Sequence, residues 1–316
     1  MAMLTELPAA SARTHRSTRR ARTGRPLRHK RAIAPYLFLA PFYILFAVFF
    51  IFPIGFTAYL SLSSWDEVGP IKFIGLANYS HLFHDPTFLT VVWNTVVYML
   101  GSLVIAFVLA LPLALALNSK YLVGRSIARL LYFAPIVTPG VAIAVVFNLI
   151  FGSNPGVVNG VLQAFGLKPV SWLLSTELSK IVVLILVAWQ YIGLTMLYFL
   201  AGLQGVPPSL REAAQLDGAS GWKVIRHVVL PSLRPMMLFV LVTTLIGSSQ
   251  IFDQPFVLTA GGPINSSLSI ANYIYQQGLS DLDFGYASTI GVVLLVVVTA
   301  TGIFLYRRLT PNEGRR

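Results

Sequence analysis

Hydrophobic residues along this chain form long unbroken runs, and charged residues gather between the runs. Because the backbone in lipid must pair its own polar groups, and because these runs do not alternate as a β-barrel would, the pattern predicts transmembrane helices and an all-α fold. A helix needs roughly 20 apolar residues to cross a bilayer, so each run suffices for one crossing. The six long runs without Asp, Glu, Lys or Arg are Ala32–Trp65, Pro86–Ser119, Leu130–Leu167, Ile181–Leu210, Pro235–Phe252 and Phe284–Tyr306.

The composition agrees with a membrane protein. Hydrophobic residues make up 56% of the 316 positions and charged residues 11%, whereas about a quarter of the residues in a soluble domain are charged. This disfavours a soluble protein with six buried core helices. The first run is too long for a cleaved signal peptide and has no small-residue cleavage site after a short core, so we expect a retained helix. The chain has no cysteine, which excludes disulfides and thiol catalysis.

Basic residues gather in alternate loops. If the N-terminus is cytoplasmic and the chain crosses six times, the inner segments are 1–32, about 119–129, about 203–234 and 307–316. All but three of the 23 Lys and Arg residues then lie inside. The exceptions are Lys72, Lys168 and Lys180. Cytoplasmic loops carry an excess of Lys and Arg, so this bias predicts that both termini are cytoplasmic.

Residues 1–32 form a separate basic segment that we expect to be a disordered cytoplasmic tail. Its charge fits an anchor for topology, attraction to anionic lipid, or nucleic-acid binding. No aromatic residue is interleaved with its arginines, which disfavours the last role, and no nucleic-acid partner is expected. At the other end, residues 309–316 are expected to form a short cytoplasmic tail.

The inner segment 206–235 breaks the membrane pattern. Ser209 with Glu212 three residues later predicts a capping box that starts a helix. Gly218 can take the left-handed conformation that ends it, and Ser220 can cap a second helix before Pro231 and Pro235 change the chain's direction. The product is a helix, a glycine corner and a second helix at the inner membrane face. Such an elbow suits either a docking element or an amphipathic connector lying on the bilayer.

At this point the residues resemble a known family. Glu212-Ala-Ala-x-x-Asp217-Gly218-Ala219, followed by Leu230-Pro231, is similar to the EAA loop of ABC-importer permease subunits. Further elements resemble the carbohydrate-type permeases, specifically the compact MalF-like or glycerol-phosphate-permease-like partner. They are Tyr36-Leu-Phe-Leu-Ala-Pro41 with Phe52-Pro53, Phe73-Ile-Gly-Leu-Ala-Asn78-Tyr79, Leu258-Thr-Ala-Gly261-Gly262-Pro263 and Asp283-Phe-Gly-Tyr-Ala-Ser288.

The resemblance implies a six-helix permease domain over 33–308 in the bacterial cytoplasmic membrane, with the coupling loop at 206–235. It implies a second homologous permease, two ABC ATPase subunits that bind ATP and Mg²⁺, and an extracytoplasmic solute-binding protein as partners. No G-x-x-x-x-G-K-[ST] loop occurs, so this chain is not expected to be an enzyme or to hold a cofactor. No histidine pair suggests a metal site. By motif position, the expected ATPase-coupling residues are Glu212, Ala213, Ala214, Asp217 and Gly218.

Polar side chains inside the fourth and fifth runs are candidates for the solute path, since such residues in lipid usually face the bundle interior. Hydroxyls, amides and aromatic rings together suit a sugar. Helix–helix hydrogen bonding is the alternative for each of them. The candidates are Trp189, Gln190, Tyr191, Thr244, Ser248 and Gln250.

The expected function is therefore half of the path for a sugar, a di- or oligosaccharide, in an ATP-driven importer. The alternatives are the same architecture moving glycerol 3-phosphate or another polyol, and a stand-alone secondary transporter. No run contains Lys or Arg, which favours a neutral solute. A secondary transporter usually shows internal repeats and mid-membrane ionisable groups, and neither is apparent in this sequence.

Overall fold

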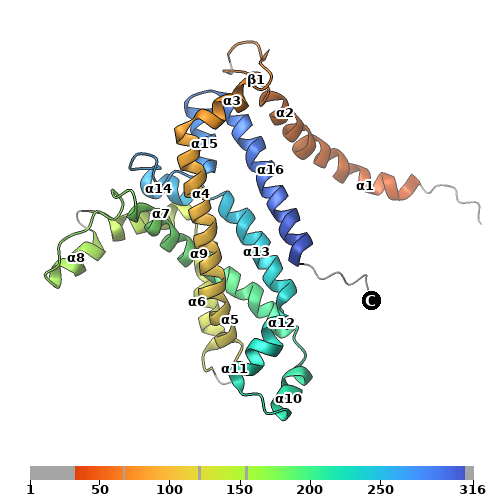
Figure 1. Cartoon of the computed structure of the whole chain (residues 1–316), viewed down its shortest axis with the longest axis vertical. Helices are drawn as coiled ribbons and strands as arrows, with labels where there is room; N and C mark the ends of the chain where they lie inside the picture. The colour runs from red at the N-terminus through yellow and green to blue at the C-terminus, as the bar shows by residue number, and fades with distance from the viewer. Residues whose placement is uncertain (1–32, 67, 120–121, 154–155, 310–316) are drawn as a thin grey trace, which may run out of the picture. The chain divides into compact units, whose positions relative to one another are not determined.

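The computed structural model describes residues 33–66, 68–119, 122–153 and 156–309 (Figure 1). Within these segments the chain is helical, with one short antiparallel strand pair, β1 (Ser63–Ser64) and β2 (Lys72–Phe73), in which Ser63 faces Phe73. The chain divides into two compact units, one ending at Phe52 and the other beginning at Pro53. The tails expected at 1–32 and after Leu309 lie outside the described residues.

The first unit contains α1 (Ile33–Phe46) and the π-helical turn η1 (Ala47–Ile51). Phe42, Phe46 and Phe50 stack along it, with ring centroids 6.1 and 5.3 Å apart. Together with α2 (Phe52–Leu60), the stretch Tyr36–Leu60 is long and apolar enough to cross a membrane. The first hydrophobic run is therefore a helix, as its pattern predicts.

Three further stretches of the described chain are continuous and long enough to span a bilayer. One is Pro86–Leu117, built from α4 (Pro86–Val104), η2 (Ile105–Ala110) and α5 (Leu111–Leu117); the others are α9 (Leu178–Gln204) and α16 (Phe284–Leu309). Helix α9 begins before the fourth charge-free run, so Lys180 lies in its first turn rather than in a loop. The Lys180 Nζ donates a hydrogen bond to Asn94 Oδ1 at 3.0 Å.

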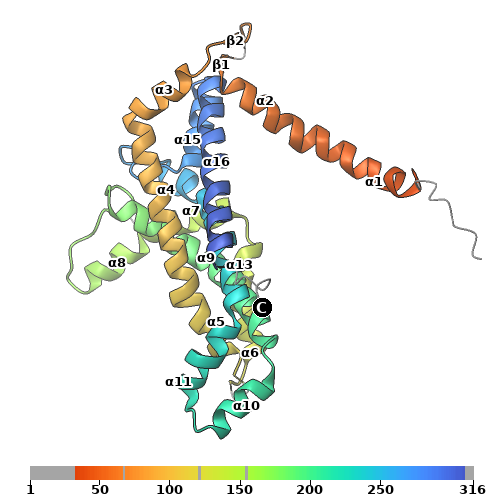
Figure 2. The ribbon, with the colours of Figure 1, turned by 45° about the vertical axis from the view of Figure 1, so that its right-hand side comes forward.

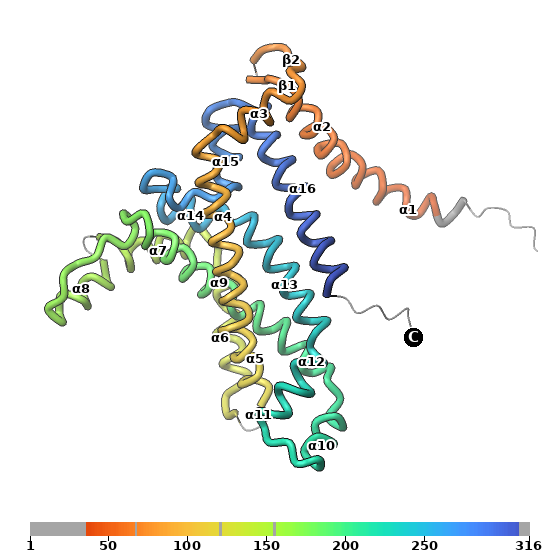
Figure 3. The backbone as a smooth tube through the Cα atoms, in the orientation of Figure 1, coloured from red at the N-terminus to blue at the C-terminus, as the bar shows by residue number. Residues whose placement is uncertain are grey.

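The third run is not the continuous helix that its length suggests, and the chain also bends sharply just before the fifth run. Helices α6 (Arg125–Val137) and α7 (Gly140–Phe151) meet at a bend of 100°, at Pro139. A residue before proline is pushed to extended backbone, and Thr138 has φ −79° and ψ 132°. The segment Gly221–Ser232, made of α11 (Gly221–Val224), η3 (Ile225–Val229) and α12 (Leu230–Ser232), bends by 67° into α13 (Arg234–Ser249) (Figure 3). The described residues thus hold four continuous spans, or six if each bent pair crosses once.

In the second unit, α13 packs against α4, α9 and α16, and α9 also contacts α5, α6, α7 and α14 (Asp253–Thr259). Figures 1 and 2 show the end of α5 and the start of α6 at the same end of this unit as α10 (Pro208–Leu216) and α11. The strand pair, α3 (Ala77–His84) and the start of α16 lie at the opposite end. This separates the expected inner loops from the expected outer loop 66–85. Which end is cytoplasmic stays a prediction from the basic residues. The remaining short elements are α8 (Val157–Ala164), α15 (Ile270–Tyr275) and η4 (Gln276–Ser280).

A buried carboxylate ties three helices together at the end that carries the strand pair. Asp85 caps α4 by accepting a hydrogen bond from the Thr87 backbone N–H at 2.8 Å. Its other oxygen accepts from the hydroxyls of Tyr273 and Tyr286, at 2.5 and 2.6 Å. Burial alone would raise the pKa of Asp85, but these bonds and those from the backbone outweigh it and hold the pKa below its ordinary value.

We expect Asp85→Asn to lower the free energy of unfolding at pH 7 by about 1–3 kcal/mol, because an amide cannot accept all three of these bonds. Since the wild-type pKa is lowered, the carboxylate's contribution is present above about pH 4 and is lost as the pH falls through the lowered value. The difference between the two proteins in thermal unfolding should therefore shrink below about pH 4. Asp281→Asn, at an exposed residue whose carboxylate accepts from Gln277 Nε2, is the control.

Gly193 marks the closest approach of α9 to α6. A Cβ built there would collide with the carbonyl oxygen of Tyr132. We expect Gly193→Ala to destabilise the protein by roughly 1–3 kcal/mol, because the backbones must separate. Gly291→Ala on α16, where a Cβ would meet nothing within 4 Å, should be neutral or stabilising. Equal thermal stability of the two variants in detergent would contradict this account of the helix contact.

Candidate functional site

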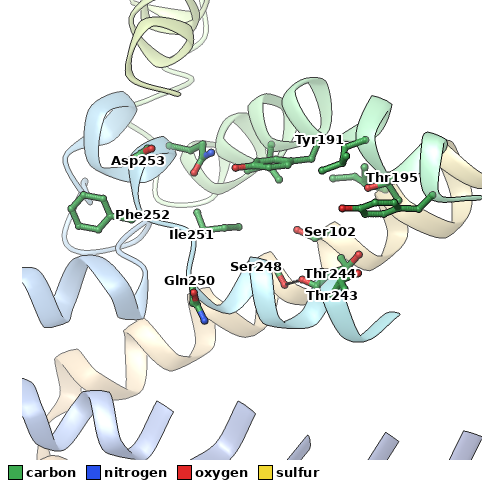
Figure 4. Close-up of a pocket in the computed structure, with 16 residues that line it drawn as sticks. Ser102, Tyr191, Thr195, Thr243, Thr244, Ser248, Gln250, Ile251, Phe252 and Asp253 are labelled. Carbon is green, nitrogen blue, oxygen red and sulfur yellow. Dashed lines mark hydrogen bonds between the residues drawn. The ribbon is translucent and has the colours of Figure 1, made fainter. Parts of the chain in front are cut away.

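A cavity of about 320 Å³ lies in the second unit between α4 and η2, α9, α13 and α14 (Figure 4). Most of its 16 lining residues carry hydroxyl, amide or carboxyl groups, and the rest are apolar or glycine. The polar residues are Ser102, Tyr191, Thr195, Tyr198, Thr243, Thr244, Ser248, Gln250, Asp253 and Gln254. The cavity therefore combines apolar walls with hydrogen-bonding groups from several helices.

The two main walls come from α9 and α13. On α9, Tyr191, Thr195 and Tyr198 are spaced by four and three residues, which places them on one helix face. On α13, Thr244 and Ser248 are one turn apart. Figure 4 shows Tyr191 and Thr195 across the cavity from Thr244 and Ser248. Two helices thus present polar groups to the same space from opposite sides.

Ser102 of α4 is a lining residue that the sequence analysis did not select. It is 7% exposed, and its hydroxyl has no hydrogen-bond partner among the described residues. An unpaired buried polar group costs about 1–3 kcal/mol, so a solute or a water in the cavity would satisfy it. The sequence feature that could have identified Ser102 as a lining residue is slight: it is a serine next to Gly101 in the middle of the second apolar run.

Four of the six predicted path residues line this cavity: Tyr191, Thr244, Ser248 and Gln250. Trp189 and Gln190 do not. Successive helical residues point about 100° apart, so neighbours of Tyr191 face elsewhere. The ring of Trp189 packs on Phe147 at 5.8 Å between centroids, and Gln190 is 5% exposed. Gln190 Oε1 instead accepts a hydrogen bond at 2.8 Å from Nε2 of Gln254, which does line the cavity.

The elbow between α9 and α13 has the shape that its sequence predicts, except at its start. Gly218 has φ +79°, and the bonds from Ala219 N to Ala214 O and from Gly218 N to Gln215 O close α10 in the manner of a Schellman motif. The predicted capping box is wrong. Helix α10 begins at Pro208, a favoured first helical residue, so Ser209 lies inside the helix and no side chain caps it.

One side of the elbow is held by the protein and the other is open. Val224 and Val229 are buried in a cluster with Leu117 and Phe199, and Ala214 packs on that cluster. The other predicted coupling residues, Glu212, Ala213, Asp217 and Gly218, are exposed. Ser220 occupies the N-cap position of α11, as predicted, but its hydroxyl makes no cap bond. The elbow is thus anchored on its inner side and presents the motif outward.

Comparison with known proteins places the chain in a family. Residues 102–314 match the family model described as binding-protein-dependent transport system inner membrane component. The chain is 37% identical over 283 residues to the arabinooligosaccharides transport system permease protein AraP of Bacillus subtilis (strain 168), covering 88% of this chain and 89% of that protein. It is 35% identical over 233 residues to the lactose transport system permease protein LacF of Rhizobium radiobacter, covering 72% and 78%.

A solved structure is similar throughout. A chain of the bacterial alginate ABC transporter, crystallised in complex with an alginate pentasaccharide-bound periplasmic protein, matches with a TM-score of 0.79 at 26% identity, over 90% of this chain and 97% of that one. The protein therefore belongs to the family of binding-protein-dependent transport system inner membrane components, the multi-pass, non-catalytic permease subunits of ABC importers.

Proposed function

We propose that this chain forms half of the transmembrane path for a sugar, a di- or oligosaccharide, delivered by an extracytoplasmic binding protein. The observation that carries the proposal is the cavity between α9 and α13, where hydroxyls and amides from facing helices surround a space edged by tyrosine rings. Sugar hydroxyls both donate and accept hydrogen bonds, and the apolar face of a sugar ring packs on aromatic rings. The relatives named for arabino-oligosaccharides and lactose support the same class of solute.

The other parts of the transporter are proposed as separate chains. A second, homologous permease would complete the path, and two ABC ATPase subunits would bind ATP and Mg²⁺, since this sequence has no phosphate-binding loop. The alginate transporter, crystallised with its periplasmic protein, supports a binding protein at the outer side. The outward face of the elbow, with Glu212 and Asp217, would dock on an ATPase subunit.

The path from the elbow to the cavity is short and is helical on either side of the 67° bend between α12 and α13. Helices α11 and α12 lead directly into α13, whose last turns carry Thr244 and Ser248. Val229 and Leu233 in this stretch are buried, so the elbow moves together with the core that it packs on. A push on the elbow by the ATPase would therefore be transmitted to the cavity wall through packed helices rather than through a flexible loop.

We expect Thr244→Val and Ser248→Ala each to lower the apparent affinity for the solute in uptake by roughly threefold to tenfold, because each removes one hydroxyl from the cavity. Thr90→Val is the control, since the Thr90 hydroxyl is exposed and bonds only Pro86 O. Proteoliposomes with the complete transporter provide the measurement. Uptake kinetics that match the wild type in both cavity variants would remove this cavity from the path.

The glycine corner gives a matched pair for the coupling role. A Cβ at Gly218 or at Gly221 would meet nothing within 4 Å, but Gly218 has φ +79° and Gly221 does not have a positive φ. The left-handed conformation costs an L-residue roughly 1–2 kcal/mol. Gly218→Ala should therefore reduce uptake and binding-protein-stimulated ATP hydrolysis several-fold without loss of membrane insertion, whereas Gly221→Ala should leave both unchanged. Equal activity of the two variants would count against the elbow as the coupling element.

A further inference from the structure

The two ends of the cavity differ in chemistry. Figure 4 shows Ser102, Thr195 and Thr244 toward one end and Asp253 with Gln250 toward the other. Among the described lining residues, none is Lys, Arg or His, and Asp253 is the one with an acidic side chain. This chain therefore offers a negative charge to a solute in the cavity and offers no cation to balance it.

Helix α13 adds partial negative charge at the same place. Its last turn, including Gly247 and Ser248, lines the cavity. The carbonyl oxygens of Ile246 and Gly247 in this turn accept from Ser249 Oγ and Gln250 N, and the aligned peptide dipoles of the helix still place partial negative charge at its C-terminus. The Ser248 hydroxyl points its proton back to the Thr244 carbonyl oxygen at 2.6 Å, which leaves its own oxygen as an acceptor. An anion next to this turn would find acceptors where it needs donors.

The position of Asp253 is set by a third helix. A Cβ on Gly140, the first residue of α7, would lie 3.1 Å from Asp253 Oδ2 and 3.3 Å from Asp253 Cβ. The carboxylate thus packs against the N-terminal end of α7, where roughly half an elementary positive charge favours it without cancelling it. Asp253 is thus an exposed lining residue whose carboxylate also contacts α7.

We propose that Asp253, together with the C-terminal end of α13, excludes anionic solutes from this cavity and restricts the path to uncharged sugars. The inference rests on the proposed function, since it takes the cavity to be the solute path. Asp253 is exposed, and like charges at a protein surface still repel more strongly than in bulk water. The hydroxyls of an uncharged sugar can donate to Asp253 at one end and accept from Ser102 or Thr195 at the other.

The absence of cysteine from the sequence allows a direct test that does not depend on the solute's identity. Thr244→Cys places one thiol of this chain in the cavity wall. In the assembled transporter, that thiol is reacted with a cationic, ammonium-bearing thiosulfonate and with an anionic, sulfonate-bearing one of similar size. Mass spectrometry of this chain gives the two modification rates. We expect the cation to react faster, and we expect Asp253→Asn to lower the cation-to-anion ratio on the order of tenfold.

The ratio of the two modification rates distinguishes an effect of charge from an effect of accessibility, because a wider or looser cavity would speed the reaction of both reagents. Asp281→Asn removes the same charge from an exposed residue outside the lining and should leave the ratio unchanged; Asp253→Glu should keep it high. If Asp253→Asn fails to assemble, Asp253→Ser removes the charge with a smaller side chain. A ratio near one in Thr244→Cys, or a ratio that does not respond to loss of the carboxylate, would overturn the proposal.

Failure here and failure of the proposed function give different results. If Thr244→Val impairs uptake but Asp253→Asn leaves the cation-to-anion ratio unchanged, the cavity is the path and the charge proposal alone is wrong. If the ratio depends on Asp253 while both hydroxyl variants transport normally, the cavity is cation-selective but does not carry the solute.

Discussion

A backbone within the hydrocarbon layer must have its hydrogen bonds satisfied by the protein, and this requirement shapes the site. Helix α13 ends at Ser249 and α14 begins at Asp253, so the three residues between them leave the helical ladder. The freed carbonyls are paired by side chains: Ser269 Oγ donates to Ile251 O at 2.5 Å, and Asn272 Nδ2 donates to Phe252 O at 3.1 Å. The break is thereby tolerated, and it forms the wall of the cavity that carries Asp253.

Much of this architecture can be predicted from the sequence because it follows from local rules. Charge-free runs predict the spans, the left-handed glycine at 218 predicts the corner, and the motif around Glu212 predicts the permease family, which the comparisons confirm. The bend at Pro139 also follows from a local rule, the restriction that a proline places on the residue before it. The length of a charge-free run does not reveal such a bend. The start of α10 was misjudged because Pro208 at the first helical position outweighs the serine that follows it.

The cavity lining was only partly predictable, for a tertiary reason. Polarity within an apolar run indicates that a side chain avoids lipid, and it does not say which neighbour it meets. Tyr191 and Gln190 are adjacent in sequence, yet one lines the cavity and the other pairs with Gln254. Ser102 reaches the cavity because α4 packs beside α9 and α13, a contact between segments far apart in the chain. Helix packing, which the periodicity does not specify, decides these cases.

Two of the motifs that resemble the family, those around Asn78 and Gly285, serve the architecture. Asn78 donates to the carbonyls of Ser61 and Ser63, at 3.2 and 2.9 Å, and a Cβ on Gly285 would collide with Ser63 O. These contacts join the strand pair to α3 and α16 and lie away from the cavity lining. The solute class is therefore inferred from side chains between these motifs, such as the hydroxyls and amides that line the cavity.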